Sequence, residues 1–270
     1  MLPLRPFQSR NLWRQLGRMM PLSTLYRPFS TKPHTNHKNQ KEAEGDKRRQ
    51  RDCRREYRDE QACVLDAAIS HVVRLGWSEE AMICGAKDVG LSPSIVGSFA
   101  RKEAALVEYF MDLCLQKLAD KIESGLDLPD LILSQRISKI VRTRLEMQIP
   151  YISKWHQALS IQAQPVNIST SLKQRAILVD EIWDAAGDQS MDINWYVKRT
   201  VLGGIYSATE VYMLTDHSPD FQDTWMFSER RIKDAFDLQK TFQEAMYLAE
   251  AVGAGLGSSL QGPMKRLFRT

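Results

Sequence analysis

The sequence lacks most of the features that mark disulfide-stabilised, membrane-spanning and catalytic proteins. Its four cysteines form no Cys-x-x-Cys pair and have no histidine at metal-ligand spacing, so we expect reduced thiols and no metal site. No apolar run reaches the roughly 18 residues that a membrane-spanning helix needs, which leaves only a peripheral membrane contact open. It has no glycine-rich phosphate loop and no histidine beside a nucleophile, so we predict no cofactor and no catalytic residue.

Proline and glycine are scarce within the periodic parts of the chain. The 270 residues include 11 prolines and 14 glycines, and strand-like alternation of polar and apolar residues is rare. Good helix formers dominate, and apolar residues recur at helical spacing. We therefore predict an all-α protein.

Acidic residues are absent up to Lys41. Arginine recurs there every four or so positions among large apolar residues, which makes a basic amphipathic face typical of a mitochondrial transit peptide. Because Arg27-Pro28-Phe29-Ser30 is similar to a matrix-protease site, we predict a transit peptide over residues 1–29. The alternative is a disordered basic arm that binds nucleic acid. The face is made by Leu4, Arg5, Phe7, Arg10, Leu12, Arg14, Leu16 and Arg18.

The basic charge is confined to the start of the chain. Residues 1–58 carry 15 lysines and arginines against 5 acidic residues, whereas the remainder carries 22 against 28. The segment 30–60 is polar and cannot bury enough apolar surface to offset the entropy of the chain. We interpret this segment as a disordered charged linker.

Strong helical periodicity extends over residues 61–236, which we assign to one helical domain. Gly76 ends its first helix, and Ser78 can cap the second by accepting backbone N–H bonds. Ser92-Pro93 opens a short third helix, and a longer one follows. This succession has the shape of a helix-turn-helix.

A further helix is predicted over residues 192–214, and it carries four polar and aromatic residues at i, i+3, i+4 and i+7. Gly203 and Gly204 lie in its middle, where each costs up to about 1 kcal/mol relative to alanine. We therefore expect another helix or a ligand to approach closely at the glycines. The shared face is made by Asp192, Trp195, Tyr196 and Arg199.

The same region carries a resemblance to a known family. Gly187–Ser190, Asn194–Tyr196, Ser218–Phe221 and Asp223–Trp225 resemble the lipid-binding proteins of mitochondrial coenzyme Q biosynthesis, and a thinner match extends from about Cys63 to Asp234. The resemblance implies a TetR-repressor-like helical bundle with an N-terminal helix-turn-helix and a C-terminal amphipathic helix. It also implies a homodimeric, non-enzymatic protein of the mitochondrial matrix, peripheral to the inner membrane. Such a protein would bind isoprenoid quinone intermediates as its ligand and present them to the pathway's di-iron hydroxylase.

The predicted helix-turn-helix is poorly suited to DNA. Its would-be recognition helix, Ser92–Phe99, contains no lysine, arginine, asparagine or glutamine, which are the side chains that contact phosphates and base edges. We expect the shape to serve packing alone and predict no nucleic-acid partner. The alternative, a TetR-type ligand-sensing DNA-binding regulator, would need such contacts. A lipid-modifying enzyme would need a convergent set of catalytic groups, and none is visible.

Two sets of site residues follow. The large apolar side chains of residues 140–214 suit a bundle that encloses an apolar ligand, although ordinary core packing would explain each of them singly. Aromatic and arginine side chains are common interface anchors, although Trp195 could instead face the core or the homodimer. The predicted lipid pocket is Met147, Trp155, Leu202, Ile205 and Tyr206. The predicted partner-binding surface is Asp192, Trp195, Tyr196 and Arg199, to which the resemblance adds Asp180, Glu181 and Ile182.

The chain ends in a predicted amphipathic helix over residues 237–261 and a basic tail over residues 262–270. An apolar face flanked by cations suits the surface of an anionic membrane, and the alternative is an ordinary core helix. The predicted membrane-binding residues are Leu238, Phe242, Met246, Ala249, Val252 and Leu256.

Overall fold

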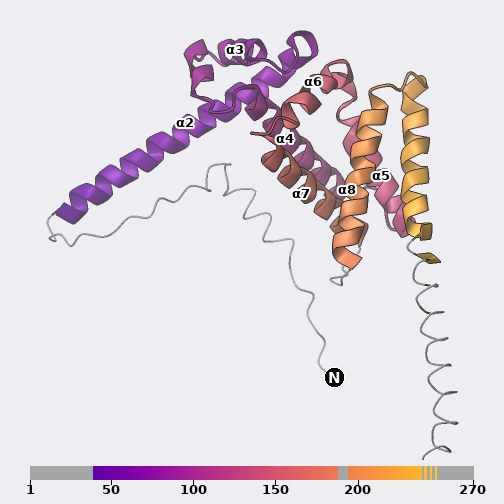
Figure 1. The fold of residues 1–270 in the computed structure, drawn as a ribbon. Helices are drawn as coiled ribbons and strands as arrows, with labels where there is room; N and C mark the ends of the chain where they lie inside the picture. Colours follow the sequence, from indigo (N-terminus) through magenta and orange to yellow (C-terminus); the bar gives the residue numbers. More distant parts are fainter. Residues whose placement is uncertain (1–38, 188–193, 239, 242–243, 245–246, 248–270) are drawn as a thin grey trace, which may run out of the picture. The chain divides into compact units, whose positions relative to one another are not determined.

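The computed structural model describes residues 39–187, 194–238, 240, 241, 244 and 247 (Figure 1). Every regular element in these ranges is a helix, which confirms the predicted all-α class. The chain divides into two units, Met1–Arg55 and Glu56–Thr270, and the buried residues lie in the second. Across the described residues, no helix combines the length and the apolar character that crossing a membrane requires.

The helix α2 spans Asn39–Leu75 and begins well before Gln61. Over residues 39–60 this differs from the disordered linker that we predicted for residues 30–60, and residues 30–38 lie outside the described residues. The composition of the segment explains the difference, because lysine, arginine, glutamate and glutamine lose little rotamer freedom in a helix. The predicted transit peptide, residues 1–29, lies outside the described residues.

Three elements follow α2 in the order that we predicted: α3 (Glu79–Asp88), η1 (Pro93–Ser98) and α4 (Glu103–Glu123). Ser78 caps α3 as expected, since its hydroxyl accepts the Ala81 N–H at 3.3 Å. The short third helix is a 3-10 helix rather than an α-helix. The helix-turn-helix shape is therefore present.

A first core cluster joins α2, α3 and α4 to α6 (Ile152–Gln162). Its centre is aromatic: the ring centroids of Trp77 and Phe110 are 5.2 Å apart, and those of Phe110 and Trp155 are 5.5 Å apart. Such tilted and edge-to-face contacts add to the stabilisation from burial alone. This cluster fixes the position of α6 against the helix-turn-helix.

A second core cluster is formed mainly by α5 (Leu133–Glu146), α7 (Ile168–Ala186), α8 (Asn194–Met213) and the helix over residues 222–238. In Figure 1, α8 and the helix over 222–238 run side by side, and ring stacking of Tyr212 on Phe227 joins them at a centroid distance of 4.7 Å. The remaining turns of the bundle are η2 (Ile149–Tyr151) and η3 (Pro219–Phe221).

The two glycines of α8 have different surroundings. A Cβ added at Gly203 would lie 3.7 Å from Val179 of α7, which is ordinary van der Waals contact. A Cβ at Gly204 would have no described atom within 4 Å. The expected approach of another helix is therefore met at Gly203 but not at Gly204, which faces outward.

Candidate functional site

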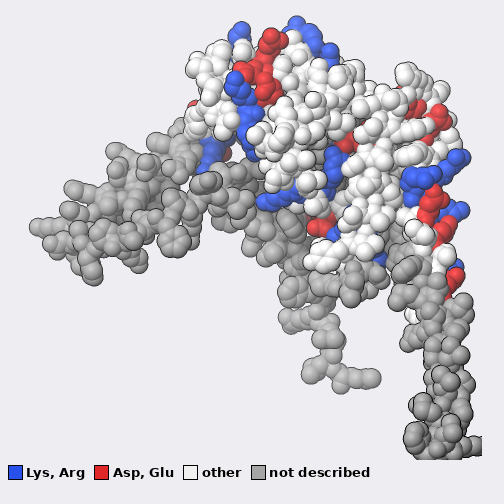
Figure 2. Space-filling model, viewed as in Figure 1, with Lys and Arg blue, Asp and Glu red and all other residues white. Residues whose placement is uncertain are grey.

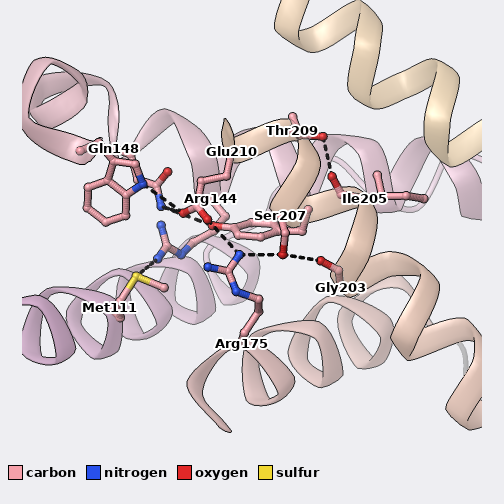
Figure 3. Close-up of polar contacts among 11 residues, drawn as sticks. Met111, Arg144, Gln148, Arg175, Gly203, Ile205, Ser207, Thr209 and Glu210 are labelled. Carbon is pink, nitrogen blue, oxygen red and sulfur yellow. Dashed lines mark hydrogen bonds and ion pairs between the residues drawn. The ribbon is translucent and has the colours of Figure 1, made fainter. Parts of the chain in front are cut away.

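A group of polar side chains lies inside the bundle where the two core clusters meet (Figure 3). Met147, directly after α5, and Ile152, the first residue of α6, pack against both clusters. The polar groups come from α4, α5, the turn after α5, α6, α7 and α8. Several distant stretches of sequence therefore converge at one buried point.

Glu210 of α8 is the centre of this group and is only 1% exposed. One carboxylate oxygen accepts the Gln148 Nε2–H at 2.9 Å and the Trp155 Nε1–H at 3.2 Å. The other oxygen accepts a bond from Arg175 Nη1 at 2.9 Å. Because a buried carboxylate is stable only when it is paired and hydrogen-bonded, these three donors explain its position in the core.

Arg175 of α7 completes the ion pair and also donates to the Ser207 hydroxyl at 3.0 Å. Its guanidinium lies over the Tyr206 ring, 5.4 Å from the centroid. Burial by itself lowers the pKa of Arg175, but the neighbouring Glu210 carboxylate outweighs it and raises the pKa. Burial also raises the pKa of the Tyr206 hydroxyl above its usual range, so this tyrosine is neutral at physiological pH.

Arg144 of α5 is the unusual member, because its side chain is fully buried and poorly paired. Its Nη2 group donates to the Met111 sulfur at 3.3 Å, which is a weak acceptor. Among the described residues, its Nε and Nη1 groups have no hydrogen-bond partner. The amide oxygen of Gln148, four residues further along, also has none in that part of the chain.

The predicted lipid-pocket residues occupy this region. Trp155, Leu202 and Tyr206 are buried, and Met147 and Ile205 are half-buried. Trp155 and Tyr206 both contact the polar group, whereas Leu202 belongs to the second core cluster. Ordinary core packing would place them there as well, so their contact with a lipid stays a prediction.

Our reading of the sequence missed the polar residues Arg144, Gln148, Arg175 and Glu210. A signal for two of them was present. Arg144 continues the apolar face that Ile137 and Val141 define at helical spacing, and Glu210 lies one turn beyond the buried Tyr206. A charged residue at a core position of an amphipathic helix marks a buried polar site.

The predicted partner-binding surface is partly assembled at the other end of the α7–α8 pair. The Arg199 guanidinium stacks 3.8 Å from the centroid of the Trp195 ring and forms an ion pair with Asp180 of α7. Tyr196 packs edge-on against Trp195 at a centroid distance of 4.6 Å and is 73% exposed. Glu181 is half-buried. Asp192 lies outside the described residues.

Ile182 does not lie on this surface. It is fully buried in the second core cluster, because the side of α7 that packs on α5 and α8 includes it together with Leu178 and Ala186. Its assignment as a partner contact was therefore wrong. The alternative that Trp195 faces the core is also not met, since Trp195 is half-exposed and belongs to neither core cluster.

The surface beside this patch is apolar. Figure 2 shows few charged side chains over α8, whereas the neighbouring helix over residues 222–238 carries both signs of charge. The exposed apolar residues of α8 are Tyr196, Val197, Val201, Val211 and Tyr212.

Most of the predicted membrane-binding residues lie outside the part of the chain that the structure describes. Leu238 is 71% exposed, and the other predicted membrane-binding residues, Phe242, Met246, Ala249, Val252 and Leu256, lie outside the described residues. No group of three or more potential metal ligands occurs among the residues that the structure covers.

Comparison with known structures defines the class of fold. A TetR transcriptional regulator from Nitrosomonas europaea superposes with a TM-score of 0.52 at 17% sequence identity, over 65% of this chain and 97% of that one. At this identity the likeness concerns the fold alone. The predicted TetR-like bundle is thus confirmed.

Comparison of sequences defines the family. The COQ9 family model matches residues 168–239. Ubiquinone biosynthesis protein COQ9-B of Xenopus laevis is 40% identical, with 72% of this chain and 68% of that protein covered. The COQ9 proteins of Xenopus tropicalis and Homo sapiens are 41% and 39% identical, again over 72% of this chain. The chain therefore belongs to the COQ9 family of ubiquinone biosynthesis proteins, and these three relatives are named mitochondrial. It spans 63% of the length of the Xenopus tropicalis and human proteins.

Proposed function

We propose that this chain is a non-catalytic lipid-binding protein of ubiquinone biosynthesis in the mitochondrial matrix. It binds isoprenoid quinone intermediates at the inner membrane and presents them to the di-iron hydroxylase of the pathway. The observation that supports lipid binding best is the buried meeting point of the two core clusters, where Trp155, Tyr206 and Met147 surround a few polar groups. A mostly apolar lining with a small number of polar groups is what small-molecule sites share.

A non-catalytic role agrees with the state of the buried charges. Glu210 accepts three hydrogen bonds and is paired with Arg175, so both of its carboxylate oxygens are already engaged within the protein. Burial raises the pKa of the Tyr206 hydroxyl beside it, so this tyrosine stays protonated and offers no phenolate to act as a base. These groups bind and orient rather than exchange protons.

The surface around Trp195 is the proposed hydroxylase contact. Tyr196 is largely exposed, and the Arg199–Asp180 ion pair holds the Trp195 ring in a fixed orientation beside it. Preformed aromatic and arginine side chains of this kind are frequent interface anchors because they lose little conformational freedom on binding.

The homodimer is proposed to use the outward face of α8. Val197, Val201 and Val211 are exposed on it, and Gly204 leaves room for close approach of a second helix. An apolar helix face with a small residue at its centre suits a symmetric contact with a second copy. The C-terminal segment 237–261 is the proposed contact with the inner membrane.

Lipid extraction from the purified full chain, followed by mass spectrometry, tests the central claim. We expect isoprenoid lipid at a stoichiometry near one per chain, recovered equally from wild type and from the surface variant Trp195→Lys. Protein that is folded and free of extractable lipid, and that takes up no added isoprenoid, would contradict the proposal.

A further inference from the structure

The Arg144 guanidinium is a buried charge that nothing already described accounts for. It is fully buried, its Nε and Nη1 groups have no partner among the described residues, and its one acceptor is a thioether. Buried polar groups are hydrogen-bonded in the great majority of proteins, and a buried charge is costly without a partner. An unpaired arginine in the core therefore indicates a missing acceptor.

The charge balance around Arg144 indicates what the acceptor is. The buried group contains two cations, Arg144 and Arg175, and one carboxylate, Glu210, which is already paired with Arg175. The side chains that face Arg144 from α4 and α8 do not compensate it. Burial raises the pKa of both the Cys114 thiol and the Tyr206 hydroxyl, which keeps them neutral. One positive charge is left over.

Nearby acidic residues are engaged elsewhere. Glu108 of α4 forms an ion pair with Arg101 at 2.6 Å, and Asp112 accepts the Gln174 amide at 2.7 Å. Glu146 of α5 pairs with the exposed Arg142 at 2.9 Å. None of these carboxylates has a contact with Arg144 among the interactions of the described residues. No described side chain other than the Met111 thioether accepts a hydrogen bond from Arg144, so the described residues leave this charge without a counter-charge.

We propose that the Arg144 guanidinium binds an acidic oxygen of the lipid headgroup, a carboxylate or an ionised phenol, and so fixes the polar end of the ligand between the two core clusters. This inference rests on the proposed lipid binding. A guanidinium presents adjacent N–H donors in a fixed fork that matches an acidic oxygen group. The unpartnered Gln148 amide oxygen, four residues away, can accept a hydroxyl of the same headgroup. The apolar side chains on either side receive the isoprenoid chain.

The experiment compares two probes with the same isoprenoid chain and different headgroups, the carboxylate of farnesoic acid and the neutral hydroxyl of farnesol. Each is titrated into the full-length protein by isothermal titration calorimetry. We expect wild type to bind the acid at least about tenfold more tightly than the alcohol, the scale of one buried charge-assisted hydrogen bond. Arg144→Met keeps an unbranched apolar stem and removes the guanidinium with its charge, and it should bind both probes equally.

Arg142→Met is the matched control. Arg142 lies on the same helix, is exposed, and forms its ion pair with Glu146 at the surface. This variant should keep the full preference for the acid. Circular dichroism shows whether each variant is folded. If Arg144→Met does not fold, the affinities of wild type for the acid and for the alcohol still test the assignment.

The outcomes separate this inference from the proposed function. If wild type binds both probes with equal affinity, the arginine is satisfied by a buried water, and the headgroup assignment fails while lipid binding stands. Retention of the preference by folded Arg144→Met, or its loss in Arg142→Met, overturns the assignment as well. If neither probe binds and the protein carries no extractable lipid, lipid binding itself fails.

Discussion

An ion pair in the core and an ion pair near the surface both join the helices α7 and α8, and they differ in almost every other respect. Arg175 on α7 pairs with Glu210 on α8 in the core, whereas Asp180 on α7 pairs with Arg199 on α8 near the surface. The buried carboxylate is 1% exposed and has two further hydrogen-bond donors. The Asp180 side chain is 47% exposed, and its partner is stacked on a half-exposed tryptophan.

The two ion pairs serve different purposes. A pair removed from water must be fully hydrogen-bonded, so the core pair determines which side chains can surround it. A pair in contact with water contributes little to stability, and the one near the surface instead orients an aromatic side chain. The core end of α7 and α8 is thus built around a polar centre, and the other end presents a preformed patch to the outside.

Breaking the buried pair should have the largest effect. Glu210→Ala leaves Arg175 as an unpaired charge and removes the acceptor of Gln148 and Trp155. We expect a loss of about 3–5 kcal/mol in the free energy of unfolding, the range for buried pairs that lose one partner. Urea denaturation of the purified protein measures it. A variant within 1 kcal/mol of wild type would mean that the pair is not buried in solution.

Trp195→Lys tests the predicted partner-binding surface around Trp195, and we expect its effect to be the second largest. Because Trp195 lies outside both core clusters, the melting temperature should stay near that of wild type. Binding to the di-iron hydroxylase should weaken by roughly 2 kcal/mol or more, the scale of an interface anchor. Surface plasmon resonance with the hydroxylase gives the value.

The matched control for Trp195→Lys is Val73→Lys. Val73 is an exposed apolar residue of α2, far from α8 in the sequence. Unchanged hydroxylase binding by Trp195→Lys would remove the patch from the proposed interface. An insoluble Trp195→Lys protein would show instead that the tryptophan is structural.

Asp180→Asn addresses the surface pair directly, with a smaller expected effect. It removes the charge but keeps the size, and stability should change by no more than about 1 kcal/mol because the pair is in contact with water. The measurable consequence should be in tryptophan fluorescence, since Arg199 loses the partner that holds it over Trp195. A loss of stability as large as that expected for Glu210→Ala would erase the difference between the two pairs.

Parts of this arrangement could be predicted from the sequence. The extent of α8, the cap at Ser78 and the burial of Trp155 and Tyr206 follow from local patterns, which depend on residues close together in the chain. The pairing of Arg175 with Glu210 joins residues 35 positions apart, and no local pattern encodes it. Ile182 was misplaced because a family match gives the position of a residue but not the direction of its side chain.

Arg142 and Arg144 show the same limit on one helix. Two residues apart, they point to opposite sides: Arg142 is exposed and lies over the Trp225 ring, and Arg144 is fully buried. The helical period distinguishes them, since Arg144 shares a face with Ile137 and Val141. The helical period predicts that Arg144 is buried. It does not predict whether a carboxylate faces the guanidinium, because that depends on every helix that packs around the site.

The smallest expected effect concerns Asp216, an acidic residue that is satisfied by hydrogen bonds instead of a cation. In the loop after α8 its carboxylate accepts the backbone N–H groups of Ser218 and Thr224 at 2.8 and 2.9 Å and the Thr224 hydroxyl at 2.5 Å. Burial by itself raises the pKa of Asp216, but these bonds outweigh it and lower the pKa to about 2. Because the pKa is lower in the folded than in the unfolded state, the stabilisation is complete above the unfolded value of about 3.9 and is lost as the pH falls toward 2.

Asp216→Asn should therefore be slightly less stable than wild type at pH 7, and the difference should shrink between pH 4 and pH 2. Thermal unfolding of both proteins across this range measures it, and a difference that stays constant with pH would mean that Asp216 is not held in this loop as a carboxylate.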